Sequence, residues 1–305
     1  MSGERRAGAL GALSGGIVAI SWSAIFVRWS GMPGVASAFY RMLVAAVVLW
    51  PLLPVLGKSV RGLPGRTLWT IAAAGVFFAG DVGFWNVAVM HTSAGDATFL
   101  SNCAPLFVGL FTWAITKRLP SRRFWIALEV ALAGSALIVV GDLRRSPVRS
   151  WADGLAVVAA VCFALYLVIT SRLREQCETA VLLALSTTAS AVALLVFAGA
   201  AHISLAVHGA EAWWAVLGLG LVCQVGGYFG LTYALGHLPA TVTSILWLTI
   251  APLTAIFAWI LFDERMGPTE IAGGLLILAG VWIVGRRGKT APIEAVQAIP
   301  PVAQV

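Results

Sequence analysis

The longest stretch of this sequence without an Asp, Glu, Lys or Arg runs for 51 residues, from Ala212 to Phe262. A bilayer core of about 30 Å is crossed by a helix of roughly 20 apolar residues. The stretch is therefore too long for one crossing. The segment 236–239 (Gly-His-Leu-Pro) supplies a turn inside it, because glycine permits a sharp reversal and proline disfavours a continuing helix. The stretch predicts two membrane-spanning helices.

The composition of the whole chain agrees with a membrane protein. Hydrophobic residues make up 60% of the chain and charged residues 11%, whereas soluble domains average about 25% charged residues. Too little polar surface is available to cover a water-facing globule, which excludes a soluble nucleic-acid-binding module and extensive disorder. The four cysteines show no spacing typical of a metal site or a disulfide framework. We therefore expect neither a metal nor another cofactor.

Apolar runs along the rest of the chain predict an all-α membrane protein with ten transmembrane helices. Single charges interrupt some of these runs, for example Arg41, Asp81 and Glu129. The predicted spans are residues 8–27, 34–56, 67–90, 94–116, 124–141, 153–170, 179–200, 213–235, 240–262 and 268–285.

Lys and Arg residues predict the orientation of these spans. With the N-terminus inside, fourteen of the 20 Lys and Arg residues fall in cytoplasmic segments and five on the opposite side, and Arg41 lies within a span. Such a bias is typical of cytoplasmic loops. We expect both termini in the cytoplasm, including a disordered tail over residues 290–305, which is rich in Ala, Pro, Val and Gln.

Four short matches in the same order indicate an internal repeat. In the clearest, the segment 134–141 (GSALIVVG) matches 273–280 (GGLLILAG). The repeat divides the chain into residues 8–141 and 153–287, each with five predicted spans. Because five is odd, the second unit must enter the membrane from the opposite face. Inverted repeats are a recurrent plan of transporters, which hold their substrate between the halves. The other matches are 22–27 with 163–168, 88–94 with 234–240 and 104–106 with 251–253.

These motifs carry a resemblance to a known family. Each half resembles an EamA domain of the drug/metabolite transporter superfamily, over roughly residues 8 to 287. The resemblance implies an inverted 5+5 arrangement of helices and export of amino acids or related metabolites across the bacterial inner membrane, with the aromatic amino-acid exporters as similar members. The resembling features are the aromatic start of the first span (22–27), Tyr40-Arg41, the Ala-x-x-His-x-x-Ala and Ala-Pro motifs of the fourth and ninth spans, the Asp-Glu-Arg at 263–265, and the Gly-x-x-Leu-Ile-x-x-Gly of the fifth and tenth.

The chain departs from the small multidrug members of that superfamily, which couple to protons through an acid in the first helix. No acid lies between Ala7 and Val27 or in the matching span 154–170. Facilitated movement or a different coupling is therefore the more plausible expectation.

Charges inside the membrane are costly, at about 2.5–3.5 kcal/mol each on insertion scales, so each needs a physical reason. Arg41 is interpreted either as a structural cation or as an anchor for a substrate carboxylate. Asp81 lies deeper in its span; it can pair with Arg41, bind a substrate ammonium or accept a proton.

Neutral polar groups and prolines within spans are further candidates. The amides Asn102 and Gln224 can each hydrogen-bond another helix or a substrate. A proline inside a helix leaves a carbonyl one turn back without its usual donor, so Pro105 and Pro252 are interpreted as hinges or as static kinks.

Aromatic residues are plentiful, and some are placed centrally in spans that, by the resemblance, line the central path. Their rings can stack on an aromatic side chain or hold an ammonium group, or simply pack. The candidates are Trp22, Trp85, Phe163, Tyr166, Tyr228 and Trp247.

The sequence therefore favours a secondary transporter that exports aromatic or bulky neutral amino acids by alternating access. Its expected partners are a small-molecule substrate and the lipid bilayer, and a monomer suffices for the fold. The alternative is another small metabolite, such as riboflavin, a nucleotide-like compound or a cationic drug. A membrane-embedded enzyme is disfavoured because neither His-Glu-x-x-His nor Gly-x-Ser-x-Gly occurs.

Overall fold

The computed structural model describes residues 3–91, 100–143, 150–262 and 267–285, and every regular element in these ranges is helical. The predicted all-α fold is thus confirmed, whereas the predicted tail 290–305 lies outside the described residues. The first half contains α1 (Gly3–Ser21), α2 (Ser23–Ser30), α3 (Gly34–Val55), α4 (Gly65–His91), α6 (Ala104–Thr116) and α7 (Arg122–Leu143). The second contains α8 (Ser150–Leu173), α9 (Thr179–Ala200), α10 (Gly209–Gly218), the π-helix η1 (Leu219–Gly227), α11 (Tyr228–Leu235), α12 (Ala240–Trp247), α13 (Ile250–Phe262) and α14 (Pro268–Gly285).

Eight segments of the described chain are long and apolar enough to cross a membrane, and α6 is a shorter apolar helix. Three of the eight combine consecutive elements: α1 with α2, α10 through η1 to α11, and α12 with α13. The protein is therefore an integral, multi-pass membrane protein. The count of ten spans stays a prediction.

Large apolar side chains cover much of the outer surface of the bundle. Val47, Val196 and Ile260 are each more than 60% exposed, as is Leu275. Such exposure would promote aggregation in water, but it suits contact with lipid tails. Trp69 and Trp214 are exposed near the starts of their helices, as expected for residues at the membrane interface.

Corresponding helices of the two halves run antiparallel. Tyr40, near the start of α3, donates a hydrogen bond of 3.0 Å to the Leu205 carbonyl, which follows the end of α9. At the other end, Lys58 follows α3 and pairs at 2.7 Å with Glu178, which precedes α9. Because α3 and α9 are each the second membrane-spanning segment of their half, the second half is inverted with respect to the first, as predicted.

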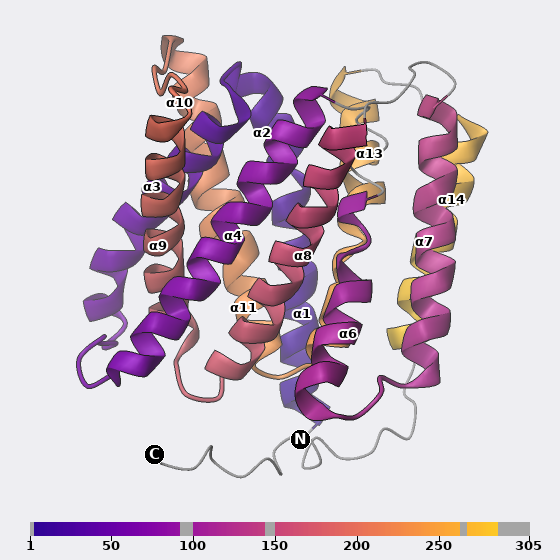
Figure 1. The fold of residues 1–305 in the computed structure, drawn as a ribbon, viewed down its shortest axis with the longest axis horizontal. Coiled ribbons are helices and arrows are strands. Elements are labelled where there is room, and N and C mark those ends of the chain that lie inside the picture. Colours follow the sequence, from indigo (N-terminus) through magenta and orange to yellow (C-terminus); the bar gives the residue numbers. More distant parts are fainter. Residues whose placement is uncertain (1–2, 92–99, 144–149, 263–266, 286–305) are drawn as a thin grey trace.

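The two halves interleave rather than packing as separate bodies. The most extensive contacts, α7 with α14, α4 with α8, α3 with α9 and α1 with α11 and η1, each join a helix of one half to a helix of the other. Exchanging the halves turns the α1–α11 contact into the α4–α8 contact, so the packing has an approximate two-fold symmetry. Figure 1 shows α7 and α14 paired at one flank of the bundle and α3 and α9 at the opposite flank.

Glycines allow the closest of these approaches. A methyl group at Gly134 of α7 would lie 2.5 Å from the Gly273 carbonyl oxygen of α14, and one at Gly280 would lie 2.6 Å from the Ala127 carbonyl oxygen. Both contacts are to backbone, which cannot move aside as a flexible side chain does. Small residues that bring backbones together stabilise helix pairs in lipid by dispersion contacts.

Four predicted spans are interrupted where we had expected continuous helices. The first breaks at Trp22 between α1 and α2, the eighth contains the nine-residue π-helix η1, and the ninth breaks at 248–249 between α12 and α13. The fourth, predicted over 94–116, resumes as α6 only after a turn at 102–103. Residues 92–99 lie outside the described residues.

Pro105 therefore stands in the first turn of α6 instead of in mid-helix, and Pro252 stands in the first turn of α13. In a first turn the missing N–H of proline costs nothing, because that group has no partner within the helix. The prolines thus mark restarts of helices rather than kinks in continuous ones.

We expect Gly134→Ala to destabilise the protein by about 1–3 kcal/mol, because the added methyl overpacks against the α14 backbone. The measurement is denaturant unfolding of the purified protein in detergent micelles. The matched control is Gly199→Ala in α9, where an added methyl meets nothing within 4 Å. Equal stability of the two variants would contradict the packing of α7 against α14.

Candidate functional site

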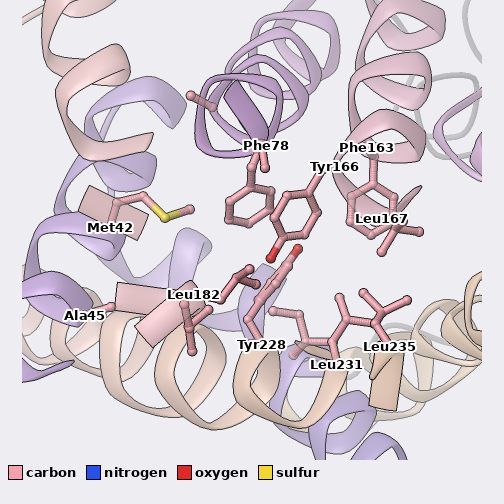
Figure 2. Packing of buried hydrophobic residues seen from close by; sticks show 14 of the residues in the cluster. Met42, Ala45, Phe78, Phe163, Tyr166, Leu167, Leu182, Tyr228, Leu231 and Leu235 are labelled. Atoms are coloured by element: carbon pink, nitrogen blue, oxygen red, sulfur yellow. The ribbon is translucent and has the colours of Figure 1, made fainter. Parts of the chain in front are cut away.

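Five aromatic residues meet inside the bundle. Phe78 of α4 stacks on Tyr166 of α8, with ring centroids 4.7 Å apart, and lies 4.6 Å from the ring of Tyr228 of α11. Trp247 of α12 lies 5.5 Å from Tyr228 and 6.3 Å from Phe163. All five are buried, and they come from both halves. Figure 2 shows Phe78 beside Tyr166, with the hydroxyl ends of Tyr166 and Tyr228 directed into the same space. We call these five residues the aromatic cluster.

Arg41 lies directly beside this cluster and, like it, is buried: only 7% of the residue is exposed. Its Nε donates to Gln224 Oε1 at 2.9 Å, and its Nη1 donates to Ser23 Oγ at 3.2 Å. Its Cζ lies 5.2 Å from the centroid of the Tyr228 ring, within the range of a cation–π contact. The cation is thus held by three different helical segments.

Irregular backbone positions these partners. Ser23 starts α2 directly after the break at Trp22, and the Ser21 carbonyl at this break accepts a hydrogen bond of 3.0 Å from Thr254 of α13. Gln224 lies in η1, and Tyr228 starts α11 directly after it. A π-helical turn inserts an extra residue and re-aims the side chains beyond it, and such turns are frequent at functional sites.

Two buried nitrogen atoms beside the cluster, Arg41 Nη2 and Gln224 Nε2, make no hydrogen bond in the structure. Buried polar groups are nearly always paired in proteins, so a group of unpaired ones in one place calls for an explanation. Ligand binding would supply the missing partners.

Asp81 lies on α4, three residues after Phe78, and is within electrostatic reach of Arg41. Within the described residues, however, no ion pair joins these two side chains, and Arg41 is bonded to Gln224 and Ser23 instead. The sequence hypothesis of a direct Arg41–Asp81 pair therefore does not describe this structure. A carboxylate next to the site stays available for a cationic group.

The remaining predicted site residues are placed less centrally. Trp22 packs on Phe257 of α13, with ring centroids 4.9 Å apart. Trp85 is half-buried on α4, beyond Asp81. Asn102 lies in the turn before α6 and donates to Ser135 of α7 at 3.0 Å, so its amide links two helices.

Two residues of the site were absent from the sequence prediction. Phe78 precedes Asp81 by three residues and so lies on the same face of its helix, which is a signal that could have identified it. Ser23 follows Trp22, but only the break in the helix makes it a partner of Arg41.

The site therefore brings together a buried cation, two unpaired hydrogen-bond donors and five aromatic rings. Within the part of the chain that the structure describes, no group of His, Cys, Asp and Glu side chains is suited to holding a metal ion.

Three relatives of this chain are named transporters or exporters. Relatives include an uncharacterised transporter of Archaeoglobus fulgidus, 28% identical over 81% of this chain and 86% of that protein. The pseudopaline exporter CntI of Pseudomonas aeruginosa is 24% identical over 85% and 88%. A probable terminal-alkyne amino-acid exporter of Streptantibioticus cattleyicolor is 27% identical over 89% and 92%.

A solved crystal structure superposes on this chain with a TM-score of 0.76, covering 90% of this chain and 96% of that one at 18% identity, which shows a shared fold. The model of the EamA-like transporter family matches twice, over residues 7–140 and 150–286. These relatives are named transporters or exporters and not enzymes. The chain is a membrane transporter and belongs to the EamA-like transporter family.

Proposed function

We propose that this transporter exports amino acids or closely related metabolites, with aromatic or bulky neutral side chains preferred. The substrate would bind between the two inverted repeats and would be released by alternating access. One arrangement carries this proposal: the buried Arg41 lies beside the aromatic cluster, where elements from both halves meet.

The chemistry of an amino acid fits this arrangement. A carboxylate would be attracted to Arg41, and an apolar or aromatic side chain would pack against the aromatic cluster. Asp81 would attract the ammonium group. The name of the Streptantibioticus cattleyicolor relative, a probable amino-acid exporter, supports the same substrate class.

We further propose that the protein lies in the bacterial inner membrane with both termini in the cytoplasm. The excess of Lys and Arg in the segments assigned to the cytoplasm supports this orientation. The breaks before α6 and within the α12–α13 segment are proposed as the hinges, with Pro105 and Pro252 in the first turns that follow.

We expect vesicles that contain the purified protein to lose labelled tryptophan or phenylalanine faster than protein-free vesicles of the same lipid. A zwitterion crosses plain lipid slowly because it loses its hydrogen bonds to water. The site between the halves would replace those hydrogen bonds and so lower the barrier to crossing. The measurement is the rate of release of label at equal internal concentrations. Release no faster than in protein-free vesicles for every amino acid tested would refute the proposed substrate class.

Trp247→Leu should lower the transport of phenylalanine relative to leucine by about three- to tenfold. The substitution removes an aromatic face from the cluster, and aromatic pairs contribute about 0.5–1.5 kcal/mol beyond area burial. Competition between the two labelled amino acids in the same vesicles measures the ratio. Trp214→Leu is the matched control because Trp214 is 73% exposed. An unchanged ratio in the Trp247 variant would place the substrate side chain elsewhere.

A further inference from the structure

We propose that Arg41 and Gln224 together form a two-donor fork that binds a single carboxylate, and that Gln224 makes the site selective for it. This proposal rests on the proposed function, in which this site holds the substrate. It assigns the atoms of the protein that bind the substrate carboxylate. It assigns a specificity-determining role to Gln224, a residue of the π-helix η1.

Two of the three nitrogens of the Arg41 guanidinium group donate hydrogen bonds, and the third does not. Nε is used by Gln224 Oε1 and Nη1 by Ser23 Oγ, whereas Nη2 is buried and has no hydrogen-bond partner. The two occupied nitrogens fix the plane of the group, so the direction in which Nη2 points is fixed as well. The free donor is therefore preorganised.

Gln224 supplies the second donor next to the first. Its side chain is fully buried, and because Oε1 accepts from Arg41, the amide offers its Nε2. This Nε2 is also buried without a partner. Two unpaired donors on two side chains that are hydrogen-bonded to each other can both be satisfied by one acceptor with two oxygens.

The charge of the site selects an anion. Within the described residues no carboxylate forms an ion pair with Arg41, so the buried cation lacks a contacting counter-charge. An uncompensated charge inside a membrane protein is costly, and a bound anion would offset that cost. One guanidinium with one amide matches a monocarboxylate, whereas a phosphate dianion would leave a second negative charge unneutralised.

Arg41 has no charged counterpart at the equivalent position of the second half. Gly75 lies against the Ser186 carbonyl and Ala189 in the same way as Gly220 lies against the Arg41 carbonyl and Val44. Ser186 therefore occupies in the second half the position that Arg41 occupies in the first. Its hydroxyl is bonded at 3.3 Å within its own helix. The symmetric fold thus carries an asymmetric site, which would orient the substrate with its carboxylate at Arg41.

The test uses Gln224→Glu, which keeps the shape of the side chain and its bond to Arg41. The new carboxylate lacks the N–H donor and neutralises the charge of Arg41, so a ligand carboxylate is repelled. The hydrogen bond between Arg41 and residue 224 is kept, so the fold is not disturbed. The probes are 3-phenylpropionate and its neutral analogue 3-phenylpropionamide. Their affinities are measured by titration calorimetry on the purified full-length protein in micelles. Gln176→Glu is the control, because Gln176 is exposed between α8 and α9.

We expect the unaltered protein and Gln176→Glu to bind the acid at least tenfold more tightly than the amide, and Gln224→Glu to lose this preference with an unchanged melting temperature. Equal affinity for acid and amide in the unaltered protein, including binding of neither at millimolar concentration, would overturn the fork. So would a preference that survives in Gln224→Glu.

The two proposals fail separately. A preference for the acid without release of any amino acid from vesicles would refute the proposed function and leave the fork in place. Release of phenylalanine and of phenylalaninamide at equal rates, together with equal binding of the two probes, would refute the fork and leave export of this class in place.

Discussion

Lipid offers no hydrogen bonds, and this constraint shapes the whole structure. Backbone that faces lipid must satisfy its own N–H and C=O groups, so irregular backbone is tolerated only inside the protein. Three of the irregular segments, at Trp22, in η1 and at 248–249, adjoin residues of the candidate site. Freed polar groups and the buried cation are thus concentrated in one region of the bundle.

The same contacts serve folding and the site. Because the halves interleave, α1 packs on α11 and α4 packs on α8, and neither half can complete the site by itself. Arg41 comes from the first half, whereas Gln224, Tyr228 and Trp247 come from the second. The inversion therefore determines which residues of the two halves meet. It brings Arg41 of the first half against Gln224 and Tyr228 of the second, so that polar and aromatic groups lie side by side.

Much of this arrangement could be predicted from the sequence. Apolar runs gave the helices, the matching motifs gave the repeat, and the odd number of predicted spans per half required inversion. The resemblance implied that Phe163, Tyr166, Tyr228 and Trp247 line the central path; their rings lie in one cluster, and their role in binding stays a prediction. The inferences about the helices and the repeat succeed because hydropathy and helical length are properties of segments, and a segment carries them wherever it packs.

The partner of Arg41 could not be predicted in this way. Opposite charge made Asp81 the natural choice, yet the hydrogen bonds go to Gln224 and Ser23. The choice depends on the break at Trp22 and on the π-helix, which alter the direction of side chains by a fraction of a turn. The sequence by itself determined a membrane-spanning helical repeat with a buried cation and many aromatic residues. Only the tertiary structure decided which of them meet, because hydrogen bonds are short and directional, whereas apolar burial is not.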